Sequence, residues 1–352
     1  MTETNNKNTE SHDGGKILAT ALRILLPLGL TILLLWVLFR KVNFHDMMEI
    51  ISDGVDYGWI LLGMFLSIFS HIFRAARWRL QLDAMDIKPP FMAICCSIFG
   101  CYALNLVFPR LGEVWRCTYI AKKEKAPLTK VIGSMVSDRL VDMLTALCIL
   151  LLTFILAAPA LRAFAEKYPV GRDLVGLMSN PVVWIASAAG VIVIGGLVYL
   201  LRNNAFIRKI IKWVGELWEG FASVIKMRGR GKFLMYTLLL WGCYYIQLYV
   251  TFFAFPFTAR LCAEPGLGFG LLPCLVAFIL STFGMAVPSN GGLGPWNIAV
   301  MFGLAVYGIT DAQGTAFSML VWSGETVMLI LLGIFTLGYI AVGKRDKRTV
   351  TG

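Results

Sequence analysis

Charged residues are scarce in this 352-residue chain: they make up 15% of it, whereas about 25% is usual in soluble proteins. Hydrophobic residues reach 58%. This balance excludes an ordinary soluble protein and predicts an integral membrane protein. Acidic residues are also fewer than basic ones, 21 against 32, so the net charge is +11. Because the basic residues lie between apolar runs, we attribute the excess to cytoplasmic loops and not to nucleic-acid binding.

Residues for common catalytic and metal sites are equally few. The chain has three scattered histidines, and six of its eight cysteines lie inside apolar runs, where cysteine is typically a small buried hydrophobe. No spacing resembles a metal site, a P-loop or a helical HExxH motif. We therefore expect no metal, no cofactor and no catalytic residue, and the sequence argues against ATP-driven transport or protease chemistry.

The apolar runs predict an all-α, polytopic membrane helix bundle. Full spans, each about as long as a bilayer requires, are expected at 17–39, 57–73, 131–158, 181–201, 233–255 and 315–342. Segments 91–108 and 270–308 meet proline and glycine and are expected to enter the membrane and return; as crossings they would raise the total to eight. Residues 1–16 form a disordered polar N-terminus, 17–343 a single transmembrane domain and 344–352 a basic cytoplasmic tail.

The distribution of basic residues supports this topology. With six full spans and two re-entrant segments, one side of the membrane holds 24 Lys and Arg and the other holds six. The positive-inside rule then places both termini in the cytoplasm, in a bacterial-type cytoplasmic membrane. Eight full crossings would put the lysines at 122–130 outside and break the pattern.

The stretch from Asn105 to Arg116 places charge where a span should continue. Arg110 and Glu113 at bilayer depth are costly unless they pair or line a wet cavity. Pro109 and Gly112 predict a break in the helix, and broken helices at this depth occur where protein or a cavity covers them. The alternative is an ordinary span at 91–108 followed by a cytoplasmic loop.

A second break follows Val287. Its candidate site residues are Asn290, Gly291, Gly292 and Gly294, which offer an amide side chain and close backbone approach. Both breaks have Phe-Gly and then Pro-x-x-Gly, although the two elements are nine residues apart in one case and four in the other. A diverged inverted repeat with one midplane site would explain this, and so would chance.

Further charges lie inside or beside the predicted spans. Asp138 and Asp142 are four residues apart and share a helix face beside Arg139; a solvated first helical turn is the alternative. Glu325 falls near the middle of the last span, where a lone carboxylate needs a partner or a cavity. The basic run at 74–79, with Trp78, is interpreted as an interfacial anchor or, alternatively, as a lipid-headgroup contact.

Together these residues suggest a phosphate-binding site. Arg110, Arg116 and Arg139 are planar, always-charged donors, and helix N-termini after Pro109 and Pro295 add backbone N–H groups. The carboxylates at 113, 138, 142 and 325 could hold the arginines while the site is empty. Exchange of these pairs for a phosphate would let an anionic headgroup cross while its acyl tails stay in lipid.

The three motifs occur in an order that resembles a known family. Asn105-x3-Pro109-Arg110-x-Gly112-Glu113-x2-Arg116, then Asp138-Arg139-x2-Asp142, then Pro288-x2-Gly291-Gly292-x-Gly294 are similar to the transmembrane region of lysylphosphatidylglycerol synthases, over about residues 15–343. The resemblance implies a flippase-like membrane protein, as in the N-terminal half of the multiple peptide resistance factor, which is implied to flip aminoacylated phosphatidylglycerol. Other relatives are linked to dolichol-type glycan lipids or hopanoid lipids.

The sequence departs from the family pattern in two places. Asp138-Arg139 stands where Glu-Arg is frequent, and Trp296-Asn297 stands where an early glutamate is expected, so that the nearest acid is Asp311 or Glu325. We expect no aminoacyl-transfer domain in this protein, so the resemblance does not imply lysyl transfer.

The expected function is a lipid translocase for an anionic phospholipid or lipid-linked precursor. The alternatives are a non-catalytic subunit that supports a lipid-modifying glycosyltransferase or synthase, and a secondary transporter for a small anion. The expected partners are anionic membrane lipids, with a second copy of the chain or a lipid-modifying enzyme as further options.

Overall fold

A computed structural model describes residues 44–52, 54–167 and 229–350, with isolated positions between 181 and 196. The predicted N-terminal tail, the span 17–39 and almost all of the span 181–201 lie outside the described residues. Every regular element in the described part is a helix. The all-α prediction is therefore confirmed.

Four long apolar helices coincide with predicted full spans. They are α3 (Tyr57–Asp83), α6 (Leu128–Leu156), α11 (Arg230–Thr251) and α15 (Asp311–Val350). Large apolar side chains along α6 and α15 face outward; Ile155 is 74% exposed and Leu337 is 68% exposed. Outward-facing apolar side chains of this size fit contact with lipid rather than with water.

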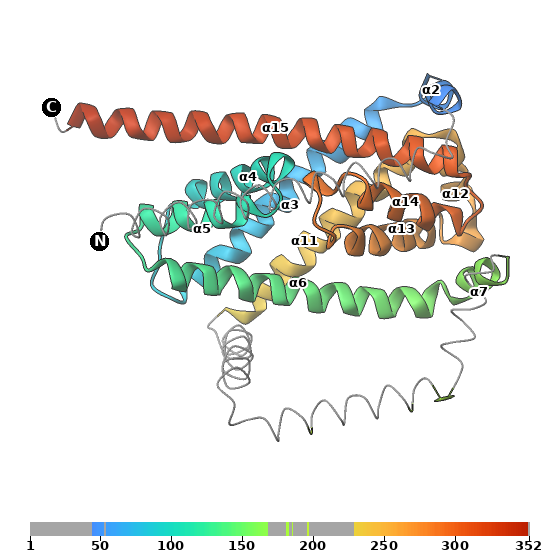
Figure 1. Ribbon diagram of the computed structural model, residues 1–352, viewed down its shortest axis with the longest axis horizontal. Helices are drawn as coiled ribbons and strands as arrows, with labels where there is room; N and C mark the ends of the chain where they lie inside the picture. Colours follow the sequence, from blue (N-terminus) through green and yellow to red (C-terminus); the bar gives the residue numbers. More distant parts are fainter. Residues whose placement is uncertain are drawn as a thin grey trace, which may run out of the picture.

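Two helical hairpins lie between α6 and α15, end to end (Figure 1). The first pairs α4 (Phe91–Val107) with α5 (Leu111–Lys123), and the second pairs α13 (Leu271–Gly284) with α14 (Pro295–Ala305). A span beginning at Pro265 qualifies by length and composition as a fifth membrane-crossing candidate among the described residues. However, its regular helix α13 has 14 residues, about 21 Å against a hydrocarbon core of about 30 Å. The chain then turns back along α14, as a re-entrant segment does.

The first break follows from local chemistry. Phe108 is extended (φ −123°, ψ 105°), as residues before proline tend to be, and Pro109 cannot donate a backbone hydrogen bond. Arg110 adopts a left-handed conformation (φ 63°) and α5 begins after it. The Asn105 Oδ1 atom accepts a hydrogen bond from Gly112 N at 2.9 Å, so this side chain caps the second helix. The stretch after the break is therefore an ordered helix packed on α4 and not an irregular loop.

The second break ends in a similar way. The 3₁₀ turn η3 (Asn290–Gly292) precedes Gly294, and Pro295 opens α14 at a position where proline is favoured. The Asn297 Oδ1 atom accepts a hydrogen bond from Gly294 N at 3.0 Å. In both hairpins an asparagine thus caps the returning helix, although an inverted repeat remains a prediction.

The hairpin tips touch each other. Asn290 donates from Nδ2 to the Val107 carbonyl at 3.0 Å, and Arg110 donates to the Ala286 carbonyl at 3.4 Å. A Cβ added to Gly291 would lie 2.6 Å from the Leu106 side chain. The two hairpins meet tip to tip, and their contact lies partway along the long flanking helices α6 and α15 (Figure 1).

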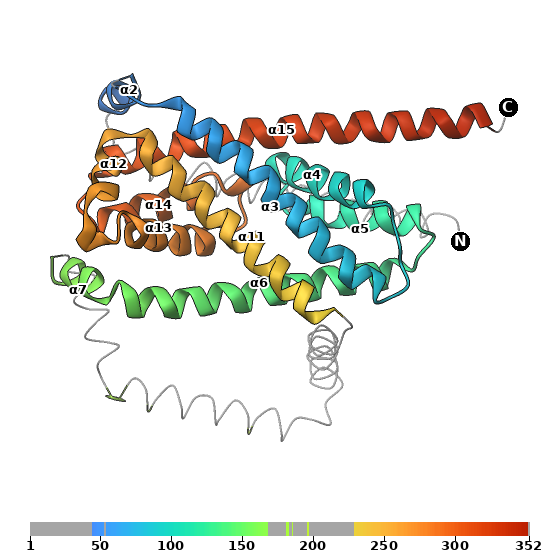
Figure 2. The same ribbon diagram turned by 180° about the vertical axis from the view of Figure 1, so that it is seen from behind.

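Helices α3 and α11 pack along each other across one face of this layer (Figure 2). Shorter elements complete the described fold: α2 (Phe44–Ser52), α7 (Ala158–Lys167), η1 (Phe252–Ala254), α12 (Pro256–Ala263) and η2 (Pro265–Leu267). Helix α3 runs ten residues beyond the predicted span end at 73. The basic run that we interpreted as an interfacial anchor is therefore the last third of a continuous helix.

Candidate functional site

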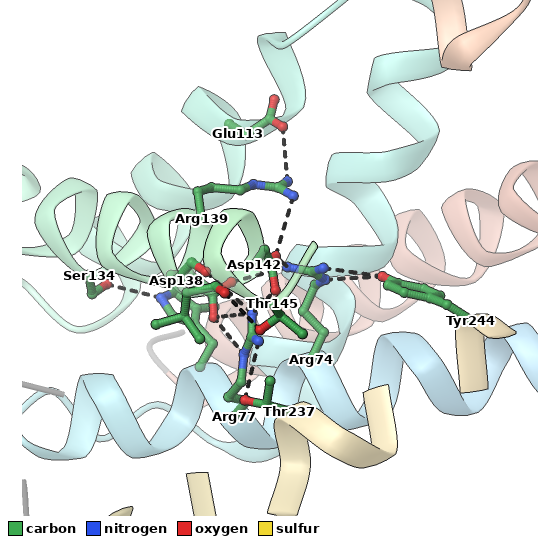
Figure 3. A network of polar contacts seen from close by, with 12 residues as sticks. Arg74, Arg77, Glu113, Ser134, Asp138, Arg139, Asp142, Thr145, Thr237 and Tyr244 are labelled. Carbon is green, nitrogen blue, oxygen red and sulfur yellow. Dashed lines mark hydrogen bonds and ion pairs between the residues drawn. The ribbon is translucent and has the colours of Figure 1, made fainter. Parts of the chain in front are cut away.

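Two arginines of α3 and two aspartates of α6 form a buried ion-pair cluster (Figure 3). Arg74 Nη1 lies 3.1 Å from Asp138 Oδ2 and 2.8 Å from Asp142 Oδ2. Arg77 Nη2 lies 2.7 Å from one oxygen of each aspartate. The spacings of three residues on α3 and four on α6 place each pair on one helix face. We call these four residues the central cluster.

Burial is deepest at the contact between the two helices. Arg77 and Asp138 are fully buried, and Arg74 is 3% exposed. An isolated buried charge costs several kcal/mol, so such groups persist only when paired and hydrogen-bonded. The interpretation of Arg74 and Arg77 as an interfacial anchor is wrong, because their charges are compensated by α6. The alternative of a solvated first turn at Asp138 is also wrong.

Helix α11 closes the central cluster from a third side. The Tyr244 hydroxyl accepts hydrogen bonds from Arg74 Nε at 3.3 Å and Nη2 at 3.2 Å. The Arg77 guanidinium lies 5.6 Å from the centre of the Phe233 ring, within the range of a cation–π contact. The sequence analysis missed the role of Arg74 and Arg77. Their spacing of three residues, like the spacing of four between the aspartates, places both side chains on one helix face.

A second pair connects the cluster to the first hairpin. Arg139 Nη2 lies 3.1 Å from Glu113 Oε1, and its Nη1 lies 3.9 Å from Asp142. Asn105 Nδ2 donates to the other Glu113 oxygen at 3.3 Å. The side chains of Arg139 and Glu113 are 37% and 20% exposed, so this pair is the accessible part of the network.

Arg116 is a buried cation of a different kind. It is fully buried, and its guanidinium lies 4.5 Å from the centre of the Trp78 ring. Trp78 in turn donates to the Ser134 hydroxyl at 3.0 Å. None of the Arg116 guanidinium nitrogens has a hydrogen-bond partner among the described residues. Stacking on an aromatic face stabilises such a cation but leaves all of its donors free.

The ion pairs of the network are balanced in charge, and the buried Arg116 beside them adds one positive charge that no described carboxylate compensates. Arg74, Arg77 and Arg139 pair with Glu113, Asp138 and Asp142, whereas the fourth arginine, Arg116, contacts the Trp78 ring and belongs to no ion pair among the described residues. In a low-dielectric environment an uncompensated charge strongly favours the binding of a counter-ion. The arrangement can therefore accept an anion with one negative charge. No group of acidic, histidine and cysteine side chains suited to a metal occurs within the described ranges.

The structure separates other predicted site residues from this network. Arg110 is exposed and contacts the second hairpin instead of joining Arg116 and Arg139. Pro109 and Gly112 shape the first break, while Asn290, Gly291, Gly292 and Gly294 shape the second. Of these residues, Arg110, Asn290 and Gly291 form the contact between the hairpin tips, and Trp322 of α15 donates to the Gly291 carbonyl at 2.9 Å.

Glu325 also lies apart from the arginines. Its Oε1 accepts a hydrogen bond from the Ser67 hydroxyl of α3 at 2.5 Å. No ion pair found in the described part of the chain includes Glu325, so the expectation that it holds an arginine is not met. Its hydrogen-bond partner on α3 belongs instead to a buried polar stripe.

Fold and network together define a polytopic helical membrane protein with an ion-pair network buried among its helices. A family model described as Lysylphosphatidylglycerol synthase TM region matches residues 24–333, and the chain belongs to that family. It is also 22% identical over 253 residues to UPF0104 membrane protein PH1989 of Pyrococcus horikoshii, covering 66% of this chain and 73% of that protein.

Proposed function

We propose that the protein moves an anionic lipid between the two leaflets of its membrane, with the headgroup bound at the ion-pair network. The observation that carries the proposal is the uncompensated positive charge of the buried Arg116, next to an ion-pair network that is accessible at Arg139. A lipid phosphate supplies the missing negative charge and several acceptor oxygens, which planar guanidinium groups bind well. Acyl chains remain outside, against the exposed apolar side chains of α6.

The accessible Arg139–Glu113 pair suggests how the site opens. A phosphate oxygen can replace Glu113 as the acceptor for Arg139, because both are anionic and the pair is only partly buried. Glu113 lies three residues before Arg116 on α5 and so shares its face. When the phosphate pairs with Arg139, Glu113 is free to pair with Arg116, so every charge is compensated once the headgroup has entered. In this proposal, the contact between the hairpin tips separates the parts of the site that face the two leaflets.

The test is lipid translocation in reconstituted vesicles. Headgroup-labelled phosphatidylglycerol is placed in the inner leaflet, and its appearance outside is followed with an impermeant quencher. We expect Arg139→Gln to slow the movement about 10-fold or more, because it removes a charge-assisted hydrogen bond worth roughly 1.5–3 kcal/mol. Arg79→Gln is the matched control, since Arg79 is 49% exposed and its ion pair among the described residues is the one with Asp83 on its own helix, at 3.7 Å.

Two outcomes would contradict the proposal. Wild-type protein that moves no labelled lipid would instead favour a non-catalytic subunit of a lipid-modifying enzyme. Equal rates for wild type and Arg139→Gln would remove the network from the translocation path.

A further inference from the structure

A buried polar stripe on α3 connects Glu325 to the central cluster. Ser67, Ser70, His71, Arg74 and Arg77 are all buried, and their spacing of three or four residues puts them on one face of the helix. Ser67 bonds Glu325 at one end of the stripe, and Arg74 bonds Asp142 at the other. The seven residues from Ser67 to Arg74 correspond to about 10 Å along the helix axis.

Glu325 is a carboxyl group without a cationic partner in the described structure. Its recorded contact is the Ser67 hydroxyl, and both lie in helices that are long and apolar enough to span a membrane. A carboxylate at such a depth is disfavoured unless a cation pairs with it, whereas the neutral acid is tolerated. The position therefore suits a group that gains and loses a proton.

His71 lies one turn from both Ser67 and Arg74. It is 3% exposed, and neither of its ring nitrogens has a hydrogen-bond partner among the described residues. Its ring packs against Tyr102 of α4, with centroids 4.6 Å apart. Buried polar atoms are almost always paired in native proteins. Two unpaired imidazole nitrogens between Glu325 and the cluster are suited to transfer a proton along the stripe.

The helices that pack against α15 place few charged side chains near Glu325. Helix α14 has no ionisable residue in its range, and α2 contacts α15 around Ala312 and Ala316, about 13 Å or more before Glu325 along the axis. The ionisable groups on the packed faces of α3 and α4 are His71, Arg74, Tyr102, Cys95, Cys96 and Cys101. The nearest permanent charge along the stripe is thus Arg74, which Asp142 already neutralises.

We propose that Glu325, with Ser67 and His71, is a proton-binding site that couples one proton to each anionic headgroup. This rests on the proposed function. If the distance along α3 from Ser67 to Arg74 is taken as the separation, an anion at Arg74 and an ionised Glu325 would be like charges about 10 Å apart, an interaction that changes proton affinity roughly 10-fold at an effective dielectric constant near 20. Headgroup and proton therefore bind together. Uptake forms one O–H bond on the Glu325 carboxylate, and release returns that proton to water on the other side.

One proton moving with one negative headgroup carries no net charge. A pH gradient should therefore drive labelled lipid toward the leaflet on the alkaline side, whereas a membrane potential of equal size should have no effect. The position of Glu325 also explains how protonation reaches the tips. Trp322, one turn earlier on α15, donates to the Gly291 carbonyl of the second hairpin.

The experiment uses vesicles containing the full chain and headgroup-labelled phosphatidylglycerol. With equal pH on both sides, wild type and Glu325→Gln are both expected to equilibrate the label. With a gradient of one pH unit, wild type should enrich the label about 10-fold on the alkaline side, and Glu325→Gln should show no enrichment. Asp311→Asn is the matched control, because Asp311 is an exposed acid at the start of the same helix, and it should enrich as wild type does.

The outcomes separate the two proposals. No equilibration by wild type at equal pH would refute the translocase, whereas equilibration without enrichment under the gradient would refute only the proton coupling. Enrichment by Glu325→Gln would refute the role of that residue. A second measurement avoids the variant: adding phosphatidylglycerol to wild type in weakly buffered detergent should cause proton uptake, and no uptake would overturn the coupling.

Discussion

The substitution Asp138→Asn tests the central cluster at its most buried carboxylate. Asp138 is fully buried and contacts Arg74 at 3.1 Å and Arg77 at 2.7 Å. The amide has almost the same shape but no charge, so the two arginines would share Asp142 alone. Removing one partner of a buried ion pair costs roughly 3–5 kcal/mol, since the remaining charge is left uncompensated. We expect the melting temperature to fall by about 5–10 °C.

A thiol-reactive dye provides the assay. Six of the eight cysteines are buried, namely Cys95, Cys96, Cys101, Cys117, Cys262 and Cys274, and they react as the protein unfolds on heating. Arg79→Gln on the same helix is the control and should change stability by less than about 1 kcal/mol, as exposed pairs do.

The double variant Arg77→Met/Asp138→Asn tests the reasoning behind that magnitude. In this double variant the Arg77 charge that Asp138→Asn leaves uncompensated is also removed. Its loss of stability should therefore be smaller than the sum of the losses in the two single variants. An unchanged melting temperature in Asp138→Asn, or strict additivity in the double variant, would refute the account of the cluster.

Two further predictions concern the hairpins. Gly112→Ala should destabilise the protein by about 1–3 kcal/mol, because a Cβ at this position would lie 2.0 Å from the Cys101 carbonyl oxygen of α4. The control Gly133→Ala should not destabilise it, since nothing lies within 4 Å of a Cβ at that position. Equal melting curves for the two variants would contradict the close approach of α5 to α4. Leu106→Cys with Gly291→Cys should form a disulfide under oxidation, since the added Cβ at 291 would lie 3.6 Å from the Leu106 Cα. Lipid movement should stop on oxidation and return on reduction, whereas movement through the cross-linked tips would show that they need not part.

Much of the fold could be predicted from the sequence because membrane burial leaves simple signals. Apolar length identified four described spans, and proline and glycine identified both breaks. The breaks were predictable because proline lacks the backbone donor that a regular helix needs and a cluster of glycines disfavours one. The extent of α3 was not, since the apolar run stops at Phe73 while the helix continues through arginines compensated by α6.

The candidate site was less predictable, because it depends on partners far apart in the chain. Arg77 and Asp138 are 61 residues apart, and no local pattern indicates that α3 packs against α6. Spacing did place Asp138 and Asp142 on one face. It could not distinguish Arg110, which lies at the tip contact, from Arg116 and Arg139, which lie in or beside the network. Nor could it show that Glu325 meets Ser67 instead of an arginine.

The most direct test of the central claim is lipid binding measured by native mass spectrometry. The full chain is titrated with phosphatidylglycerol and with zwitterionic phosphatidylcholine, for wild type, Arg139→Gln and Arg79→Gln. The account predicts that wild type and Arg79→Gln bind the anionic lipid about 10-fold more tightly, and that Arg139→Gln loses this preference. An undiminished preference in Arg139→Gln would show that the headgroup binds elsewhere and would contradict the account.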